Sequence, residues 1–259
     1  MLCSVVLLAA SFDELAGSSA SSKPGASPPI VRMTGMIEDG DAARLRRLLS
    51  KIQNTSSRLP GEPLATIEMS SLGGDLIEGM KLGYLFCELD VATVVRAGDL
   101  CLSSCALAFL GGTARHRTGD LAVSRTVEVG ATLGFHNFWL NPNHERARDA
   151  ASPSEGIAKG FNEAKGASAR LVHYATFLGV DAGFITNMLG RPPDVWDYAD
   201  TIGKFINLKI CPSGLRHSLP QYQRRAFNMC SNLLDETVSP ASSAGQSQIR
   251  QMMRVEASR

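Results

Sequence analysis

The sequence predicts an α/β fold built around a mostly parallel β-sheet. Three successive segments, residues 30–52, 64–89 and 91–112, each have the pattern of a β-strand followed by an α-helix. This alternation favours parallel strands joined by helices. Hydrophobic residues make up 44% of the 259 residues, which is enough for a sizeable core.

The first two units are predicted from their hydrophobic periodicity. Residues 30–36 form an apolar run that predicts a strand, and residues 42–52 place leucines at helical spacing with Arg and Lys on the other face. In the second unit, a strand over residues 64–69 leads through Gly73-Gly74 into a helix over residues 76–89. Glycines at such a turn suit a sharp bend or close approach of the backbone to a ligand.

The third unit ends in a turn that carries a serine. A strand over residues 91–97 breaks at Gly98-Asp99, and the small-residue segment CLSSC, residues 101–105, then enters an apolar helix that stops at Gly111-Gly112. A strand, a tight turn and a buried helix can expose a serine hydroxyl beside the free N–H groups of the helix start. The alternative is that Ser103 is only a helix N-cap.

The remaining elements are shorter and are predicted in the same way. We expect strands over residues 121–124, 126–129, 131–138 and 207–210, and helices over residues 157–178, 181–189, 199–206 and 220–234.

The chain is predicted to have three parts. Residues 1–29 are predicted to be an N-terminal tail that serves as a signal peptide or a linker. Residues 30–210 are the α/β domain, and residues 211–259 are a helical extension with a flexible tail. The apolar run over residues 1–10 has the length of a signal-peptide core but no basic residues before it. We expect a periplasmic or otherwise exported protein; the alternative is a cytoplasmic protein with a disordered tail. Because no apolar stretch reaches about 18 residues, no transmembrane helix is predicted.

Charge and cysteine content narrow the function classes. The net charge is +1 with 20% charged residues, so no footprint for nucleic acid or an anionic membrane is present. Cys101 and Cys105 have no second Cys or His pair at zinc-site spacing, and no metal or cofactor is predicted. Cys211 and Cys230 would form a disulfide in an exported protein, and the alternative is buried free thiols.

Four side chains at strand ends and in loops supply the parts of a hydrolytic site. Nucleophilic acyl transfer needs a serine, a base, a carboxylate that orients the base, and donors for the oxyanion. Ser103 lies at a strand–helix turn, His136 at a strand end, and Asp194 and Asp197 in a later loop. The alternatives are a strand-end packing role for His136 and a turn role for Asp194 after its two prolines.

Three stretches together resemble the proteolytic subunit of the Clp protease, in the ClpP/crotonase superfamily. They are SSLGGDLIEGMKLG (residues 70–83), CLSSCALAFLGGTAR (101–115) and LGFH (133–136), and residues 35–49 resemble the first strand and helix of that family. The resemblance covers about residues 31–210 and is closest to small, often exported bacterial proteins. It implies a spiral of strand–helix units with a mostly parallel sheet, homo-oligomers, and a peptide or protein substrate without a cofactor.

Carried over residue by residue, the resemblance implies a serine peptidase-like hydrolase that cleaves peptide bonds. Ser103 would be the nucleophile, because the family serine lies nine residues before the last glycine of the helix end, here Gly112. Gly74 and Ser104 would supply the oxyanion N–H groups, and His136 would be the general base.

Asp194 would be the orienting acid, with Asp197 as the fallback. Two features depart from the family: an extra polar segment around residues 117–129, and cysteines on both sides of the serine. Two other functions therefore stay open. One is a catalytically inactive ClpP-like protein used for binding or assembly, and the other is a crotonase-type acyl-CoA enzyme with the same oxyanion site.

Overall fold

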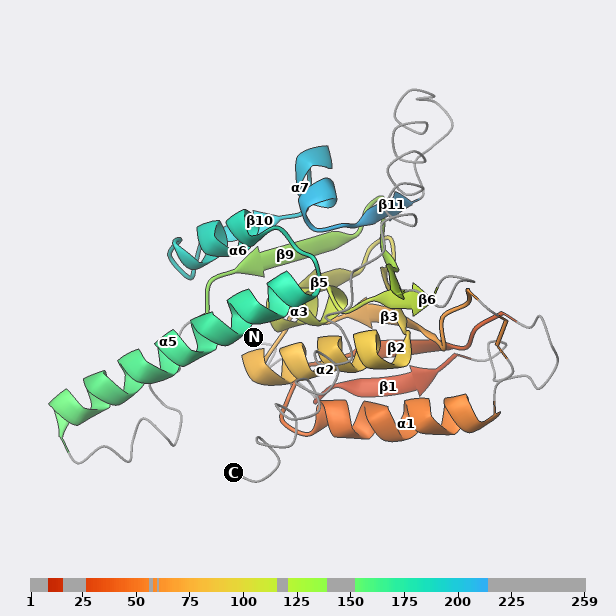
Figure 1. Ribbon diagram of the computed structural model, residues 1–259, viewed down its shortest axis with the longest axis horizontal. Helices are drawn as coiled ribbons and strands as arrows, with labels where there is room; N and C mark the ends of the chain where they lie inside the picture. Colours follow the sequence, from red (N-terminus) through yellow and green to blue (C-terminus); the bar gives the residue numbers. More distant parts are fainter. Residues whose placement is uncertain are drawn as a thin grey trace, which may run out of the picture.

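A mostly parallel six-stranded sheet forms the centre of the computed structural model (Figure 1), as predicted. The structure describes residues 9–15, 27–55, 58–59, 61–115, 121–138 and 152–213. The strand order is β1-β2-β3-β4-β8-β11, and only β1 runs antiparallel to its neighbour. The strands are β1 (Ser11–Glu14), β2 (Ile30–Thr34), β3 (Thr66–Ser70), β4 (Ala92–Val95), β8 (Arg125–Glu128) and β11 (Cys211–Ser213).

A smaller sheet carries the site described below. Its order is β10 (Trp196–Tyr198), β9 (Thr132–His136) and β5 (Leu100–Leu102), with β5 parallel and β10 antiparallel to β9. A bridge between Ser71 and Cys101 joins this sheet to the end of β3. A third pair of strands, β6 (Thr113–Arg115) and β7 (Leu121–Val123), is antiparallel.

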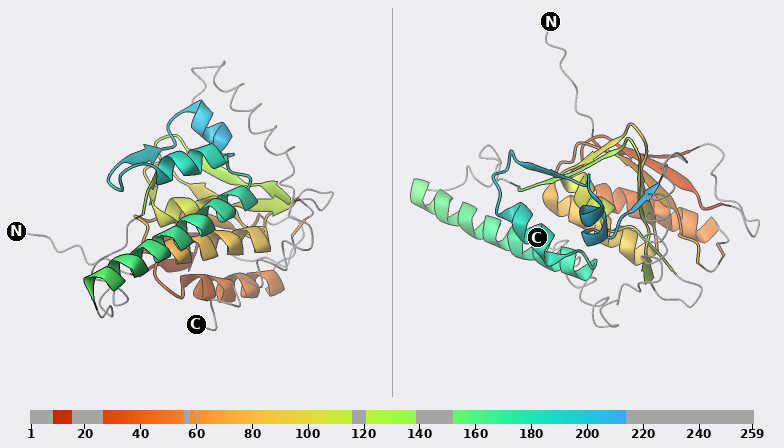
Figure 2. Two further views of the ribbon diagram at one scale, coloured as in Figure 1. Left: turned by 60° about the vertical axis from the view of Figure 1, so that its left-hand side comes forward. Right: turned by 90° about the horizontal axis from the view of Figure 1, so that it is seen from above.

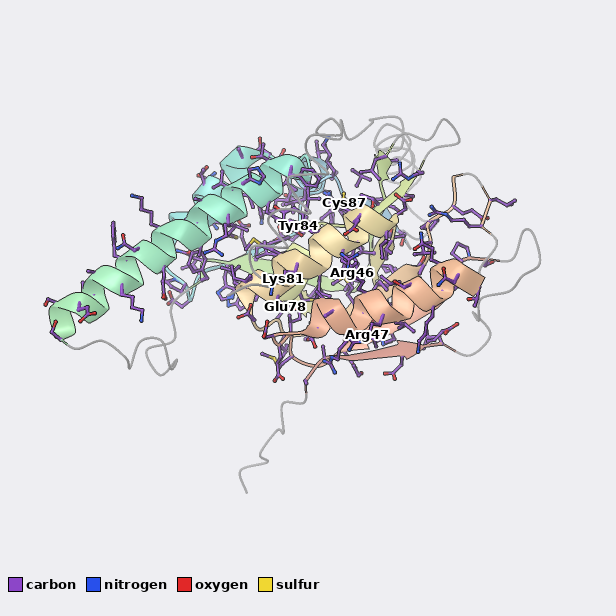
Figure 3. All side chains as sticks on the ribbon, turned by 60° about the horizontal axis from the view of Figure 1, so that its bottom comes forward. Arg46, Arg47, Glu78, Lys81, Tyr84 and Cys87 are labelled. Carbon is purple, nitrogen blue, oxygen red and sulfur yellow. A yellow bond between two sulfur atoms is a disulfide. The ribbon has the colours of Figure 1, made fainter. Side chains whose placement is uncertain are left out.

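Helices α1 (Asp41–Thr55) and α2 (Leu76–Leu89) lie side by side, with Arg46 of α1 facing α2 (Figures 1 and 3). Arg46 donates to Glu88 of α2 at 2.6 Å. The bounds of α2 are those predicted, because Asp75 accepts a hydrogen bond from the Glu78 N–H at 2.7 Å and so caps the helix start. The other helices are α3 (Ser104–Phe109), α5 (Pro153–Phe177), α6 (Ala182–Leu189) and α7 (Ile202–Asn207).

Small residues allow α2, α3 and α5 to pack closely. A Cβ atom at Gly83 of α2 would collide with the hydroxyl of Tyr174 of α5. Tyr174 is fully buried and donates that hydroxyl to the carbonyl oxygen of Leu107 in α3 at 2.6 Å. The absence of a side chain at Gly83 is therefore what lets α5 reach α3.

The buried side chain of Arg125, in β8, holds the ends of two helices. Its guanidinium donates to the carbonyl oxygens of Leu178, at the end of α5, and of Leu208, at the end of α7, at 3.0 and 2.9 Å. Burial lowers the pKa of Arg125 to about 10. A cation at a helix C-terminus is favourable because the carbonyl groups there carry partial negative charge.

The first half of α5 projects beyond the rest of the molecule (Figure 2). Ile157 and Phe161 are 75% and 68% exposed there, whereas the second half of the helix buries Leu171, Tyr174 and Ala175. No helix of the described residues is long and apolar enough to cross a bilayer.

Two differences from the expected elements lie in the predicted tail and after α6. Residues 11–14, within the predicted tail, form β1 at the edge of the main sheet. Where a strand over residues 207–210 was predicted, α7 ends at Asn207 and a turn follows, and the strand comes next as β11, which pairs with β8. The sheet thus continues past residue 210. The predicted helix over residues 220–234 lies outside the described residues.

Candidate active site

Ser103 occupies the turn between β5 and α3 in an unusual backbone conformation. Its φ and ψ angles are 56° and −125°, and its N–H donates to the carbonyl oxygen of Gly134 in β9 at 2.9 Å. A positive φ is uncommon outside glycine and persists where the surrounding structure imposes it. Ser103 stands at the N-cap position of α3, but its side chain makes no capping hydrogen bond, so the alternative of a side-chain cap is not observed.

His136, the last residue of β9, is hydrogen-bonded through both ring nitrogens. Nε2 lies 2.7 Å from Ser103 Oγ, and Nδ1 lies 2.8 Å from the carbonyl oxygen of Pro193. A carbonyl oxygen only accepts, so Nδ1 carries the proton in the neutral ring and Nε2 is left as the acceptor. The Ser103 hydroxyl therefore donates to Nε2, which is the arrangement of a nucleophile and its general base.

The ring of His136 is also held by stacking. Trp196 of β10 is its register partner across the strands, and the two ring centroids are 4.2 Å apart with an interplanar angle of 28°. The ring is thus held by its hydrogen bonds to Pro193 and Ser103, by the stacked Trp196 and by its own strand.

Asp194 lies beside this pair without bonding to it. It lines, with His136, Pro193 and Trp196, a pocket of about 340 Å³. Among the described residues, its carboxylate makes no hydrogen bond or ion pair. The structure therefore brings Asp194 to the site, while the main chain of the preceding residue occupies Nδ1 of His136.

Asp197 faces away from the histidine. In β10 it pairs with Phe135, so it lies on the opposite face of the small sheet from Trp196 and His136. It is 7% exposed and forms an ion pair with Lys204 at 2.8 Å. Asp197 therefore forms a structural ion pair on the face of the small sheet opposite His136.

The two predicted oxyanion donors are backbone N–H groups with no acceptor in the described part of the chain. Gly74 bridges to Ile37, but the bonds of that bridge use the N–H groups of Ile37 and Asp75. Ser104 begins α3, where the first N–H groups have no partner within the helix. The loop of Gly74 abuts the serine turn, because a Cβ atom at Gly73 would lie 2.7 Å from Ser103 Cβ.

A disulfide that was not predicted spans the turn of Ser103. Cys101 and Cys105 are bonded, with Cα atoms 5.3 Å apart. From the sequence this pair was considered only as zinc ligands; the signal for a disulfide was the four-residue spacing across a tight turn. Cys211 is also disulfide-bonded, and Cys230, its predicted partner, lies outside the described residues. No group of three potential metal ligands occurs in the described ranges.

No protein-family model matches the chain, and no curated protein matches it. Among solved structures, the fold is similar to that of a ClpP1 mutant from Listeria monocytogenes. The TM-score is 0.48 and the sequence identity 15%, over 71% of this chain and 92% of the other. The chemistry of the site therefore has to be inferred from its own contacts.

Of the other histidines, the structure describes His173, which is exposed on α5 and does not join the site. His116, His144 and His217 lie outside the described residues.

Proposed function

We propose that the protein is a serine peptidase-like hydrolase of the ClpP-like type that cleaves peptide bonds. The observation that carries this proposal is the 2.7 Å hydrogen bond between Ser103 Oγ and His136 Nε2, with Nδ1 already committed to Pro193. Those two contacts fix the tautomer in which the imidazole accepts the serine proton. The three sequence stretches that resemble the Clp proteolytic subunit support the same assignment.

In this mechanism, Ser103 Oγ attacks the carbonyl carbon of the peptide bond while its proton passes to His136 Nε2. The tetrahedral oxyanion accepts hydrogen bonds from the N–H groups of Gly74 and Ser104. His136 then donates its proton to the leaving amine, which gives an acyl-serine. Water, deprotonated by the same nitrogen, hydrolyses that ester and returns the enzyme.

In this proposal, two groups share the role of the third triad member. The carbonyl oxygen of Pro193 orients the ring, and the carboxylate of Asp194, in the same pocket, stabilises the imidazolium through space. Asp197 is not needed, because its charge is balanced by Lys204 on the other face of the sheet.

A fluorophosphonate probe tests the proposal directly. The wild type is expected to form one covalent adduct, which peptide mass spectrometry maps to Ser103. Ser103→Ala should form none, and Ser50→Ala, at an exposed position of α1, should label like the wild type. Labelling that persists in Ser103→Ala would contradict the assignment. An unlabelled wild type would favour the inactive binding or assembly protein.

We also propose that the protein acts where thiols are oxidised, in the periplasm or outside the cell. Cys101, Cys105 and Cys211 are all in disulfides, which form and persist in such compartments. Mass spectrometry of protein isolated from its own cells under thiol-blocking conditions tests this, since free thiols at these positions would contradict it.

Self-association is the last part of the proposal. Two apolar side chains, Ile157 and Phe161, are one helical turn apart on the projecting half of α5, and both are more than two-thirds exposed. Replacing both with Glu should lower the mass measured by analytical ultracentrifugation. An unchanged mass, or a monomeric wild type, would contradict this surface.

A further inference from the structure

The disulfide between Cys101 and Cys105 closes a five-residue ring with Ser103 at its centre. Both cysteines have no exposed surface. The proposed mechanism uses the serine, the histidine and two N–H groups, but it leaves this covalent bond without a role.

The two ends of the disulfide are anchored in different parts of the site. Cys101 lies in β5, where it pairs with Leu133 of the strand that ends in His136, and it also bridges to Ser71, just before the Gly73-Gly74 loop. Cys105 lies in the first turn of α3, next to the N–H group of Ser104. The bond thus joins α3, which supplies the N–H group of Ser104, to β5. Strand β5 lies between His136 of β9 and the loop of Gly74.

Hydrogen bonds from the Ser103 N–H to Gly134 and between Ser103 Oγ and His136 hold the turn, and the disulfide adds a covalent constraint. Ser103 holds a φ of 56°, which L residues rarely adopt, and it makes no side-chain cap to α3. A backbone in that region relaxes toward ordinary angles unless its surroundings prevent it. A short covalent ring across the turn restricts the angle between β5 and α3, and with it the direction of the Ser103 side chain.

We propose that the Cys101–Cys105 disulfide positions the nucleophile, so that full reactivity of Ser103 is reached only after this bond has formed. This inference rests on the proposed function. The cysteines are positioning residues, because they act through Ser103 and Ser104 and touch no reacting atom. Formation joins two thiols in one S–S bond and passes two electrons and two protons to a disulfide-bearing oxidant, such as a thiol–disulfide oxidoreductase. Since both sulfurs are buried, the bond forms while the chain folds, before the core closes.

A variant without the bond but with a filled core tests the proposal. Cys101→Val/Cys105→Ala places a β-branched residue in the strand and a good helix former in the helix, and it keeps the site apolar. The matched control is Cys211→Ala, which removes a disulfide from β11. Circular dichroism and thermal melting establish the folded fraction of each variant.

The expected result is a loss of reactivity that folding does not explain. Per folded molecule, the double variant should react with the fluorophosphonate probe about 100-fold more slowly, because a displacement of about 1 Å in a reacting group has an effect of that size. Peptide hydrolysis should show the loss in kcat with KM nearly unchanged. Cys211→Ala should keep the wild-type rate even if it melts earlier. A double variant that labels within about two-fold of the wild type would overturn the proposal.

A second readout does not depend on turnover. In NMR spectra, the ¹⁵N chemical shift of His136 Nε2 reports whether that nitrogen accepts the hydrogen bond from the Ser103 hydroxyl. This His136 signal should differ between the wild type and Ser103→Ala. It should not differ between the double variant and the double variant that also carries Ser103→Ala. If the wild type is unlabelled but this pattern holds, the hydrolase assignment fails and the positioning role stands. If the difference persists without the disulfide, the positioning role fails whatever the probe shows.

Discussion

The imidazole of His136 donates its Nδ1 hydrogen to the main-chain carbonyl oxygen of Pro193, 2.8 Å away. A carbonyl oxygen fixes the tautomer and the ring direction as a carboxylate would. It does not bring the full negative charge that a carboxylate places beside the imidazolium. In the proposed mechanism, the orientation of the base is therefore separate from its electrostatic stabilisation.

This separation sets the expected effect of removing the nearby charge. Asp194→Asn should slow peptide hydrolysis by about ten-fold, which corresponds to about 1.4 kcal/mol of imidazolium stabilisation. A loss near 10⁴-fold would instead mean that Asp194 takes over Nδ1 during the reaction, as an orienting acid does. An unchanged kcat would remove Asp194 from the mechanism. Asp197→Asn is the control, and it should lower the melting temperature more than kcat because it breaks the ion pair with Lys204.

His136 itself is tested by the rate of labelling. His136→Ala should label about 10² to 10⁴-fold more slowly than the wild type, because Ser103 loses its proton acceptor. His173→Ala, at an exposed position of α5, serves as the control and should label like the wild type. A His136 variant that labels at the wild-type rate would point to another base.

Gly74 is expected to be intolerant of a side chain for two reasons. Its φ is 146°, and a Cβ atom would collide with the carbonyl oxygen of Ile37. Gly74→Ala should therefore displace the N–H group from the oxyanion and lower kcat by about 10² to 10³-fold. Gly98→Ala is the matched control, since Gly98 has a φ of 87° but no atom within 4 Å of its Cβ position. It should cost about 1 kcal/mol of stability at unchanged kcat. Equal kcat in both variants would exclude Gly74 as a donor.

Arg125 is predicted to matter for stability and not for chemistry. Arg125→Ala leaves two buried carbonyl oxygens and a cavity, so the free energy of unfolding should fall by about 3–5 kcal/mol. Arg125→Lys should recover little, because an ammonium group lacks the planar fork that reaches both helix ends. Urea unfolding measures these changes. Arg47→Ala, on the exposed face of α1 (Figure 3), should stay within about 0.5 kcal/mol of the wild type.

The sequence predicted best the elements that depend on local residue patterns. The bounds of α2 follow from Asp75 and the apolar run after it, and the parallel sheet follows from the alternation of strands and helices. Ser103 was singled out at a strand–helix turn and His136 at a strand end, and the structure places them in hydrogen-bond contact although they are 33 positions apart in the sequence. Their catalytic roles remain a prediction.

What the sequence concealed depends on tertiary contacts. The acceptor for His136 is a main-chain oxygen of Pro193, and every residue carries such an oxygen, so no residue type marks it. The strand β10 was not predicted because three residues are too few to show a period of two. The exposure of Phe161 depends on how far α5 projects from the body, which helical periodicity alone does not encode.

The partners of Arg125 have a consequence for how the chain is synthesised. The carbonyl groups that it needs lie 53 and 83 residues later in the sequence, and the acceptor for His136 lies 57 residues after that histidine. Chains emerge from the ribosome N-terminus first. A nascent chain that has just completed β9 lacks both the helix-end carbonyl groups that Arg125 contacts and the carbonyl oxygen that accepts a hydrogen bond from His136. The contacts that hold Arg125 and orient the His136 ring can therefore all be in place only after residue 208 has been synthesised.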